Sequence, residues 1–140
     1  LRPFNIYGVG QSKNFLIPSI IAQLQCGKIE LKDPEPKRDF IYISDVVDAY
    51  IKAGEFDKDF EIFNIGYGKS YSVKEIVNKL IKLFGKDVKV DYKNARRKKE
   101  IMDTIADIKK AKVKLCCKPK VGIDEGLDHL LELQTQIVMQ

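Results

Sequence analysis

Arg38 is the residue of this sequence that is best placed to hold an anionic ligand. It follows a loop directly and starts an alternating apolar segment, so its guanidinium can reach outward from the end of a sheet. A planar fork of N–H donors suits a phosphate, because a bidentate pair fixes the orientation of the anion. The spacing by itself favours a plainer alternative, a surface arginine paired with Asp39 or Asp45.

A run of four cations, Arg96, Arg97, Lys98 and Lys99, precedes Glu100. So short a run is a weak signal for a nucleic acid or a membrane surface, and no aromatic residues alternate with it to stack on bases. A solvated loop is the usual explanation. These residues therefore do not predict a site by themselves.

Four further positions could contribute polar or apolar contacts. Asn5 could present its amide at a sheet edge, although an asparagine that forms a turn is the alternative. Lys69 follows the turn at residues 66–68, but two glycines alone are weak evidence for phosphate binding. Leu16 and Leu31 are core residues if only their apolarity is considered.

The sequence does not indicate nucleophilic or metal chemistry. His129 is the only histidine, and because no nucleophile motif accompanies it we expect a packed or surface histidine. Cys26, Cys116 and Cys117 are odd in number and two are adjacent, which suits neither a disulfide nor a zinc site. We expect reduced thiols in a cytoplasmic protein.

Short strands alternate with helices in the elements that must position these residues. Strands are expected at residues 1–7, 38–43, 61–65, 88–92 and, as a short extended segment, 101–105. Helices are expected after the caps Ser12, Ser44, Ser72 and Asp107, and over residues 123–133. Ser72 and Glu75 have the spacing of a capping box. The pattern predicts one α/β domain over residues 1–134 and a tail at 135–140.

Length and composition limit the possible classes of protein. A chain of 140 residues, 44% hydrophobic and 32% charged, can form one domain with a real core. No apolar run approaches the roughly 20 residues that span a bilayer, and no signal peptide precedes Leu1, so no membrane partner is expected. The net charge of +5 favours an anionic partner. The missing initial Met suggests a fragment of a longer protein.

Two segments carry a resemblance to a known family. Residues 1–8, Leu-Arg-Pro-Phe-Asn-Ile-Tyr-Gly, and 38–48, Arg-Asp-Phe-Ile-Tyr-Ile-Ser-Asp-Val-Val-Asp, together resemble the second half of the extended short-chain dehydrogenases/reductases, the nucleotide-sugar epimerases and dehydratases. The resemblance extends to about Leu131 and implies a Rossmann-type α/β fold, of which this chain is the C-terminal, substrate-binding part, a small sheet with flanking helices. In that family a glycine-rich cofactor loop and a catalytic Tyr-x-x-x-Lys pair come earlier, and this chain contains neither.

The resemblance assigns roles to the polar candidates. The arginine of the family's Arg-Asp-(aromatic) motif, matched by Arg38, contacts the nucleotide diphosphate, and Arg97 aligns with a second such arginine. Glu100 matches an acidic residue that often contacts the ribose. Asn5 matches an asparagine that bonds the substrate's phosphate or sugar. Lys69 matches the lysine of an Asn-Ile-Gly-Ser-Gly-Lys segment.

The resemblance also gives roles to apolar positions and shows departures. Leu16 and Leu31 match positions that line the nucleobase pocket, and the backbone around Phe4 lies near the nicotinamide. Lys98 and Lys99 replace the usual Pro-Gly, and residues 115–117 replace the usual Leu-Gly-Trp. These differences mark a divergent member.

The sequence thus predicts the nucleotide-sugar-binding portion of an NAD-dependent epimerase or dehydratase, with a UDP-glucose 4-epimerase-like parent as the leading hypothesis. NAD(P) is expected on the full-length parent and not on this fragment alone. The expected partners are a nucleotide-diphosphate sugar, the missing N-terminal Rossmann half and a second copy in a parent homodimer, whereas nucleic acid is not expected. The alternatives are a stand-alone, non-catalytic binding module for an anionic ligand, and a truncated piece that self-associates through its exposed strand edge.

Overall fold

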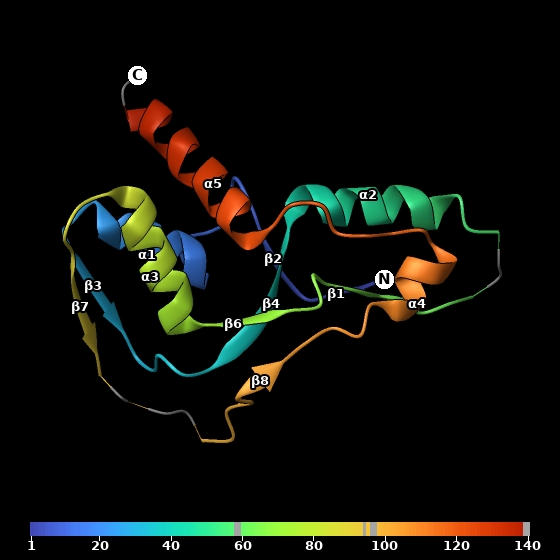
Figure 1. Ribbon diagram of the computed structural model, residues 1–140, viewed down its shortest axis with the longest axis horizontal. Coiled ribbons are helices and arrows are strands. Elements are labelled where there is room, and N and C mark those ends of the chain that lie inside the picture. Colours follow the sequence, from blue (N-terminus) through green and yellow to red (C-terminus); the bar gives the residue numbers. More distant parts are fainter. Residues whose placement is uncertain (58–59, 94, 96–97, 139–140) are drawn as a thin grey trace.

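The computed structural model describes residues 1–57, 60–93, 95 and 98–138, with only the backbone for 134–138 (Figure 1). The strands are β1 (Arg2–Pro3), β2 (Asn5–Tyr7), β3 (Lys28–Leu31), β4 (Lys37–Tyr42), β5 (Asn64–Ile65), β6 (Ser70–Ser72), β7 (Lys89–Tyr92) and β8 (Asp103–Thr104). The helices are α1 (Leu16–Leu24), α2 (Ile43–Gly54), α3 (Val73–Phe84), α4 (Lys109–Lys114) and α5 (Ile123–Val138). The prediction of an α/β fold with a small sheet and flanking helices is confirmed.

Strand β4 organises the structure, because three other strands pair with it. β2 and β8 run parallel to β4, and β6 runs antiparallel to it. Two further parallel pairs, β1 with β5 and β3 with β7, lie beside this sheet. Since side chains alternate along a strand, β4 divides the interior into two cores. Phe40 and Tyr42 enter one core and Ile41 enters the other.

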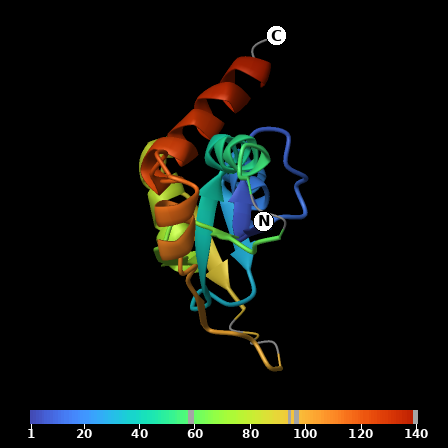
Figure 2. The same ribbon diagram turned by 90° about the vertical axis from the view of Figure 1, so that its right-hand side faces the viewer.

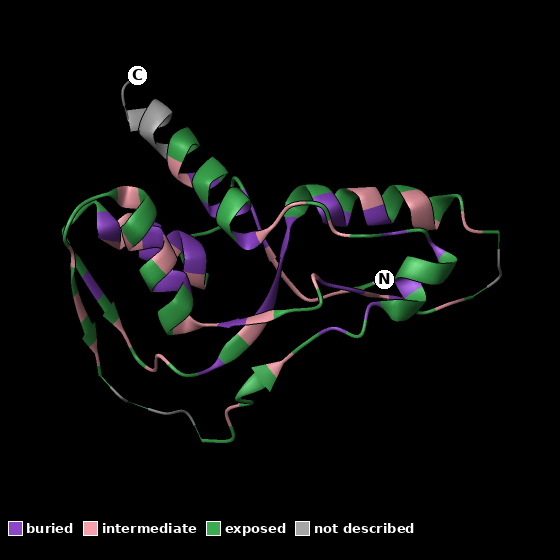
Figure 3. Ribbon diagram, viewed as in Figure 1, coloured by how far each residue is buried: buried purple, intermediate pink, exposed green. Residues whose placement is uncertain are grey.

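The first core is the larger and lies beneath α1, α3 and α5. Residues from these three helices and from β2, β3, β4 and β6 form it, and most are less than 3% exposed. The second core lies between α2, α4, β4 and β5 and is smaller. Figure 3 shows buried residues on the inner sides of the helices that cover both cores. Figure 2 shows α5 extending away from the rest of the chain.

Helix α3 begins and ends as predicted. The N–H of Glu75 donates to the Ser72 hydroxyl at 3.1 Å, and the N–H of Ser72 donates back to the Glu75 carboxylate at 2.7 Å. Gly85 ends the helix with a φ of 70°, a left-handed conformation that glycine adopts without a steric cost. Two other predicted caps, Ser12 and Ser44, are wrong.

The two helices predicted to be capped by Ser12 and Ser44 begin at other residues. α1 begins at Leu16, after Phe15, while the Ser12 hydroxyl accepts from the N–H of Asn14 in the preceding turn. α2 follows β4 without a loop, so that Ser44 already lies in its first turn. Neither helix has a side-chain cap.

Several strands differ from those expected. The segment at residues 1–7 divides at Phe4, because β1 pairs with β5 whereas β2 pairs with β4. β3 and β6, each of four residues or fewer, were not predicted. At the other end of the chain α5 continues to Val138, into the range expected to be a tail. Among the helices described, none combines the length and apolar character needed to cross a membrane.

Candidate functional site

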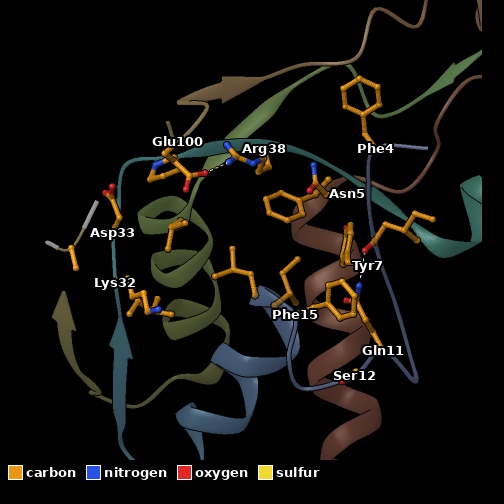
Figure 4. A pocket seen from close by; sticks show the side chains of 18 residues that line it. Phe4, Asn5, Tyr7, Gln11, Ser12, Phe15, Lys32, Asp33, Arg38 and Glu100 are labelled. Atoms are coloured by element: carbon orange, nitrogen blue, oxygen red, sulfur yellow. Dashed lines mark hydrogen bonds and ion pairs between the residues drawn. The ribbon is translucent and has the colours of Figure 1, made fainter. Parts of the chain in front are cut away.

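A cleft of about 840 Å³ opens between β2, β4, the start of α1 and the loop after β3 (Figure 4). Its lining residues come from segments that are far apart in the sequence. They are Phe4, Asn5, Ile6, Tyr7, Gln11, Ser12, Phe15, Leu16, Ile17, Leu31, Lys32, Asp33, Pro36, Arg38, Phe40, Val73, Ala95 and Glu100. The parallel pairing of β2 with β4 holds two of these segments together.

One part of the cleft is apolar. Leu16, the first residue of α1, and Leu31, the last of β3, are half-buried against the first core and line the cleft. Val73, the first residue of α3, lines the same cleft, and the exposed Phe15 extends the apolar surface. A flat aromatic ring could lose water-exposed surface here with little polar desolvation.

Arg38 brings a positive charge to the same cleft. Its guanidinium forms an ion pair with Glu100 and donates to the backbone oxygens of Lys37 and Ile101, both at 2.7 Å. Only 26% of the Arg38 side chain and 15% of the Glu100 side chain are exposed, so screening by water is reduced. Neither Asp39 nor Asp45 pairs with Arg38 among the salt bridges of the described residues.

Asn5 and Gln11 add amide groups to the cleft. The Asn5 side chain donates to the backbone oxygen of Asp39 at 3.0 Å, which ties β2 to β4 beside Arg38. Gln11 donates to the backbone oxygen of Ile6 at 2.8 Å. Each amide oxygen remains able to accept a hydrogen bond from a hydroxyl group.

The structure brings six of the eight predicted site residues to this cleft. These are Phe4, Asn5, Leu16, Leu31, Arg38 and Glu100. Lys69 does not line it; its ammonium lies 5.0 Å from the centre of the Tyr71 ring. Arg97 lies outside the described residues.

Sequence reasoning missed several lining residues. Lys32 and Asp33 directly follow β3, and a charged pair after an apolar strand residue is a signal that could have been used. Phe15 and Gln11 gave no such signal. Phe15 directly precedes α1, which packs on the distant α3, and Gln11 lies in the loop between β2 and α1.

A second, shallow hollow of about 510 Å³ lies next to the cleft and shares three residues with it, Phe4, Asn5 and Arg38. Arg2, Pro3, Asn64 and Thr104 complete its lining. Figure 4 shows the Phe4 ring turned away from the apolar wall of the cleft. The segment 4–5 therefore separates two concave surfaces.

The environments of Tyr7, Cys117 and His129 do not indicate a second reactive site among the described residues. Burial raises the pKa of the Tyr7 hydroxyl and, to a smaller extent, that of the Cys117 thiol, so both stay neutral near pH 7. His129 is exposed and lies edge-on to Tyr42, with 6.0 Å between the ring centres. The described residues contain no group of three or more His, Cys, Asp or Glu side chains that could hold a metal ion.

The chain is similar to enzymes that act on nucleotide sugars. A family model described as GDP-mannose 4,6 dehydratase matches residues 1–130. The chain is 32% identical to dTDP-4-dehydro-6-deoxyglucose reductase of Escherichia coli, over 94% of this chain and 43% of that protein. The chain therefore spans less than half the length of that relative.

Solved structures of nucleotide-sugar epimerases are also similar to this chain. UDP-glucose 4-epimerase of Thermotoga maritima with UDP-glucose has a TM-score of 0.86 and 30% identity, covering 98% of this chain and 45% of that one. UDP-glucuronic acid 4-epimerase of Bacillus cereus, in complex with UDP-glucuronic acid and NAD, has a TM-score of 0.86 and 29% identity, covering 97% and 44%. The similarity thus extends over nearly all of this chain.

Proposed function

Because the chain belongs to the extended short-chain dehydrogenase/reductase family of nucleotide-sugar epimerases and dehydratases, we propose that its cleft holds the nucleotide-diphosphate sugar of an NAD(P)-dependent enzyme. One observation carries the proposal: an apolar wall and a partly buried arginine face the same cleft of about 840 Å³. This volume lies within the range of small-molecule sites, roughly 300–1,000 Å³.

The two parts of the cleft suit the two parts of such a ligand. The base would lie between Leu16 and Leu31, and the diphosphate would lie against Arg38. Asn5 and Glu100 would receive or orient the hydroxyl groups of ribose and sugar. Arg97 is proposed as a second contact to the diphosphate. Lys69 has no role in this assignment, since it does not line the cleft.

The dinucleotide belongs to a second half in this proposal. The sequence contains neither a glycine-rich cofactor loop nor Tyr-x-x-x-Lys, so the residues present do not fit a complete dinucleotide site. They offer one edge of it, the hollow beside Phe4. When bound, NAD(P) would supply oxidation and reduction of the sugar, and this chain would bind and orient the sugar.

The leading proposal for the parent is a UDP-glucose 4-epimerase-like enzyme. Two of the similar structures are 4-epimerases that hold UDP-glucose and UDP-glucuronic acid. The Escherichia coli relative is a reductase of a dTDP sugar, so the base and the sugar are the features that an assay must decide. A parallel titration with UDP, dTDP, CDP and GDP sugars makes that decision.

The substitution Arg38→Ala tests the proposal. We expect it to weaken binding of UDP-glucose to the full-length parent more than tenfold, which corresponds to about 1.4 kcal/mol. Isothermal titration calorimetry measures the dissociation constant, and Lys112→Ala, an exposed cation on α4, is the matched control. An unchanged constant in Arg38→Ala would remove Arg38 from the site. A steep fall of affinity with salt would instead indicate an anionic polymer.

A further inference from the structure

Asp39, the neighbour of Arg38 in β4, is a fully buried carboxylate at 0% exposure. Its two oxygens accept three backbone N–H groups, those of Tyr67 at 2.7 Å, Gly68 at 2.8 Å and Ala106 at 3.0 Å. A carboxylate is costly to bury unless hydrogen bonds compensate for the lost water. These three donors provide that compensation.

The three donors belong to two segments that Asp39 joins to β4. One is the turn after β5, which contains Tyr67 and Gly68, and the other follows β8 and contains Ala106. β8 lies parallel to β4 with Arg38 opposite Thr104. The N–H of Lys37 also donates to the backbone oxygen of Met102 at 2.7 Å.

This junction decides where Glu100 lies. The segment that Asp39 and β4 hold continues backward from Ala106 to Ile101 and Glu100, both of which contact the Arg38 guanidinium. Successive side chains of a strand point to opposite faces. Asp39 therefore faces the backbone junction while Arg38 faces Glu100, and Asp39 acts through the backbone and not by pairing with the cation.

The junction is packed closely enough to transmit a displacement. A Cβ atom on Gly66 would lie 2.5 Å from the Ala106 Cβ and 2.9 Å from an Asp39 carboxylate oxygen. Real Cβ atoms do not approach other atoms so closely, so no side chain fits there. A change at Asp39 would shift the segment that carries Glu100, since close-packed contacts leave little room for local relaxation.

We propose that Asp39 is a positioning residue for ligand binding: its carboxylate fixes β4 and the segment at residues 100–106 relative to each other, so that Arg38 and Glu100 meet at the cleft in the geometry that receives an anion. The inference rests on the proposed function, because the anion is the diphosphate of the nucleotide sugar. It adds a residue that does not line the cleft.

The test uses Asp39→Asn in the full-length parent with UDP as the probe. Asparagine has the same shape but replaces one acceptor oxygen with an NH₂ group, which faces backbone donors without an acceptor. Asp45→Asn is the matched control. Asp45 is also buried, at 4% exposure, and accepts the N–H groups of Lys120 and Val121 at 3.0 Å each, but the segment that it holds contributes no residue to the cleft.

We expect both variants to lower the melting temperature and only Asp39→Asn to change binding. At a temperature where circular dichroism shows each variant folded, the dissociation constant for UDP should rise at least tenfold in Asp39→Asn and stay within twofold in Asp45→Asn. A role in folding alone would leave the constant of the folded fraction unchanged. An unchanged constant in Asp39→Asn overturns the inference.

A double mutant shows whether the effect passes through Arg38. Combined with Arg38→Ala, Asp39→Asn should cause no further loss, because the group that it positions is gone. An equal loss with and without Arg38 overturns the inference and leaves the proposed function standing. No loss in Arg38→Ala alone overturns both.

A second variant keeps the test decisive if Asp39→Asn does not fold. Ala106→Gly removes the methyl group that meets Gly66 and loosens the backbone of the same junction without changing charge. We expect it to fold and to weaken UDP binding about threefold. Unchanged binding in Ala106→Gly overturns the inference in that case.

Discussion

The two hydrophobic cores of this chain, on opposite faces of β4, differ in how completely they are covered. The first, beneath α1, α3 and α5, carries the cleft and is enclosed by helices. The second is covered by α2 and α4, and the outer side of α2 exposes three large apolar residues, Val47, Tyr50 and Ile51, by 50–59%. Figure 3 shows this alternation of buried and exposed residues along α2.

Helices of this chain cover the first core, beside which the cleft lies, whereas the second region leaves an apolar helix face exposed. β1 and β5 form a parallel pair of two residues each. Parallel sheets are normally buried on both faces and contain more strands. The cleft therefore lies on the better covered of the two regions.

Truncations in the two cores should have unequal costs. Leu80→Ala, at 0% exposure in α3, is expected to destabilise the chain by about 2–5 kcal/mol through lost burial and a cavity. Ile65→Ala, at 2% exposure in β5, should fall at the low end of that range, because the smaller core can relax towards its open side. Urea unfolding measures both, and a larger cost at Ile65 would contradict the comparison.

A glycine on α5 tests how tightly the first core is closed. Gly126 packs against Tyr7, and a Cβ atom there would overlap the Tyr7 hydroxyl and lie 3.0 Å from the Tyr42 ring. Gly126→Ala should therefore cost about 1–3 kcal/mol by overpacking. Gly122→Ala is the control, since its Cβ would lie 3.6 Å from the Tyr67 hydroxyl. A stable Gly126→Ala in thermal unfolding would show that α5 moves freely.

The open face of α2 predicts self-association of the isolated chain of 140 residues. Val47→Lys combined with Ile51→Lys should reduce the associated fraction in light scattering, while the free energy of unfolding changes by less than about 0.5 kcal/mol. Val113→Lys on α4 is the control, because Val113 is 79% exposed on a different helix. A wild-type chain that stays monomeric at high concentration would disprove the prediction.

Local signals in the sequence predicted the elements whose ends depend on neighbours in the chain. The capping box at Ser72 and the glycine after α3 are such signals. β3 and β6 were missed, since strands this short are stabilised mainly by their partners β7 and β4. Likewise, no local pattern shows that Asp39 is buried, because one of its donors, Ala106, is 67 residues away.

Only the cleft residues that belong to a family motif could be predicted from the sequence. Arg38 and Asn5 were ambiguous from spacing, and the family resemblance placed them together in a site. The structure brings them to one cleft, where their binding role stays a prediction. Phe15 has no motif, and the packing of α1 on α3 brings it there.

The smallest effect that we expect concerns acid in the second region. Glu61 pairs with Lys110 and Lys114 of α4, and these cations lower the pKa of Glu61 from its ordinary value of 4.5 to about 2. A lowered carboxyl pKa stabilises the folded state above about pH 4.5, and this contribution is lost as the pH falls towards 2. Glu61→Gln should therefore lower the melting temperature slightly at pH 7 and have less effect at pH 3. Exposed lysines also lower the pKa of the Glu30 carboxyl in β3. Glu30→Gln is therefore the matched variant in the first region. If Glu61→Gln lowered the melting temperature equally at both values of pH, the ion pairs would not connect α4 to the rest of the second core.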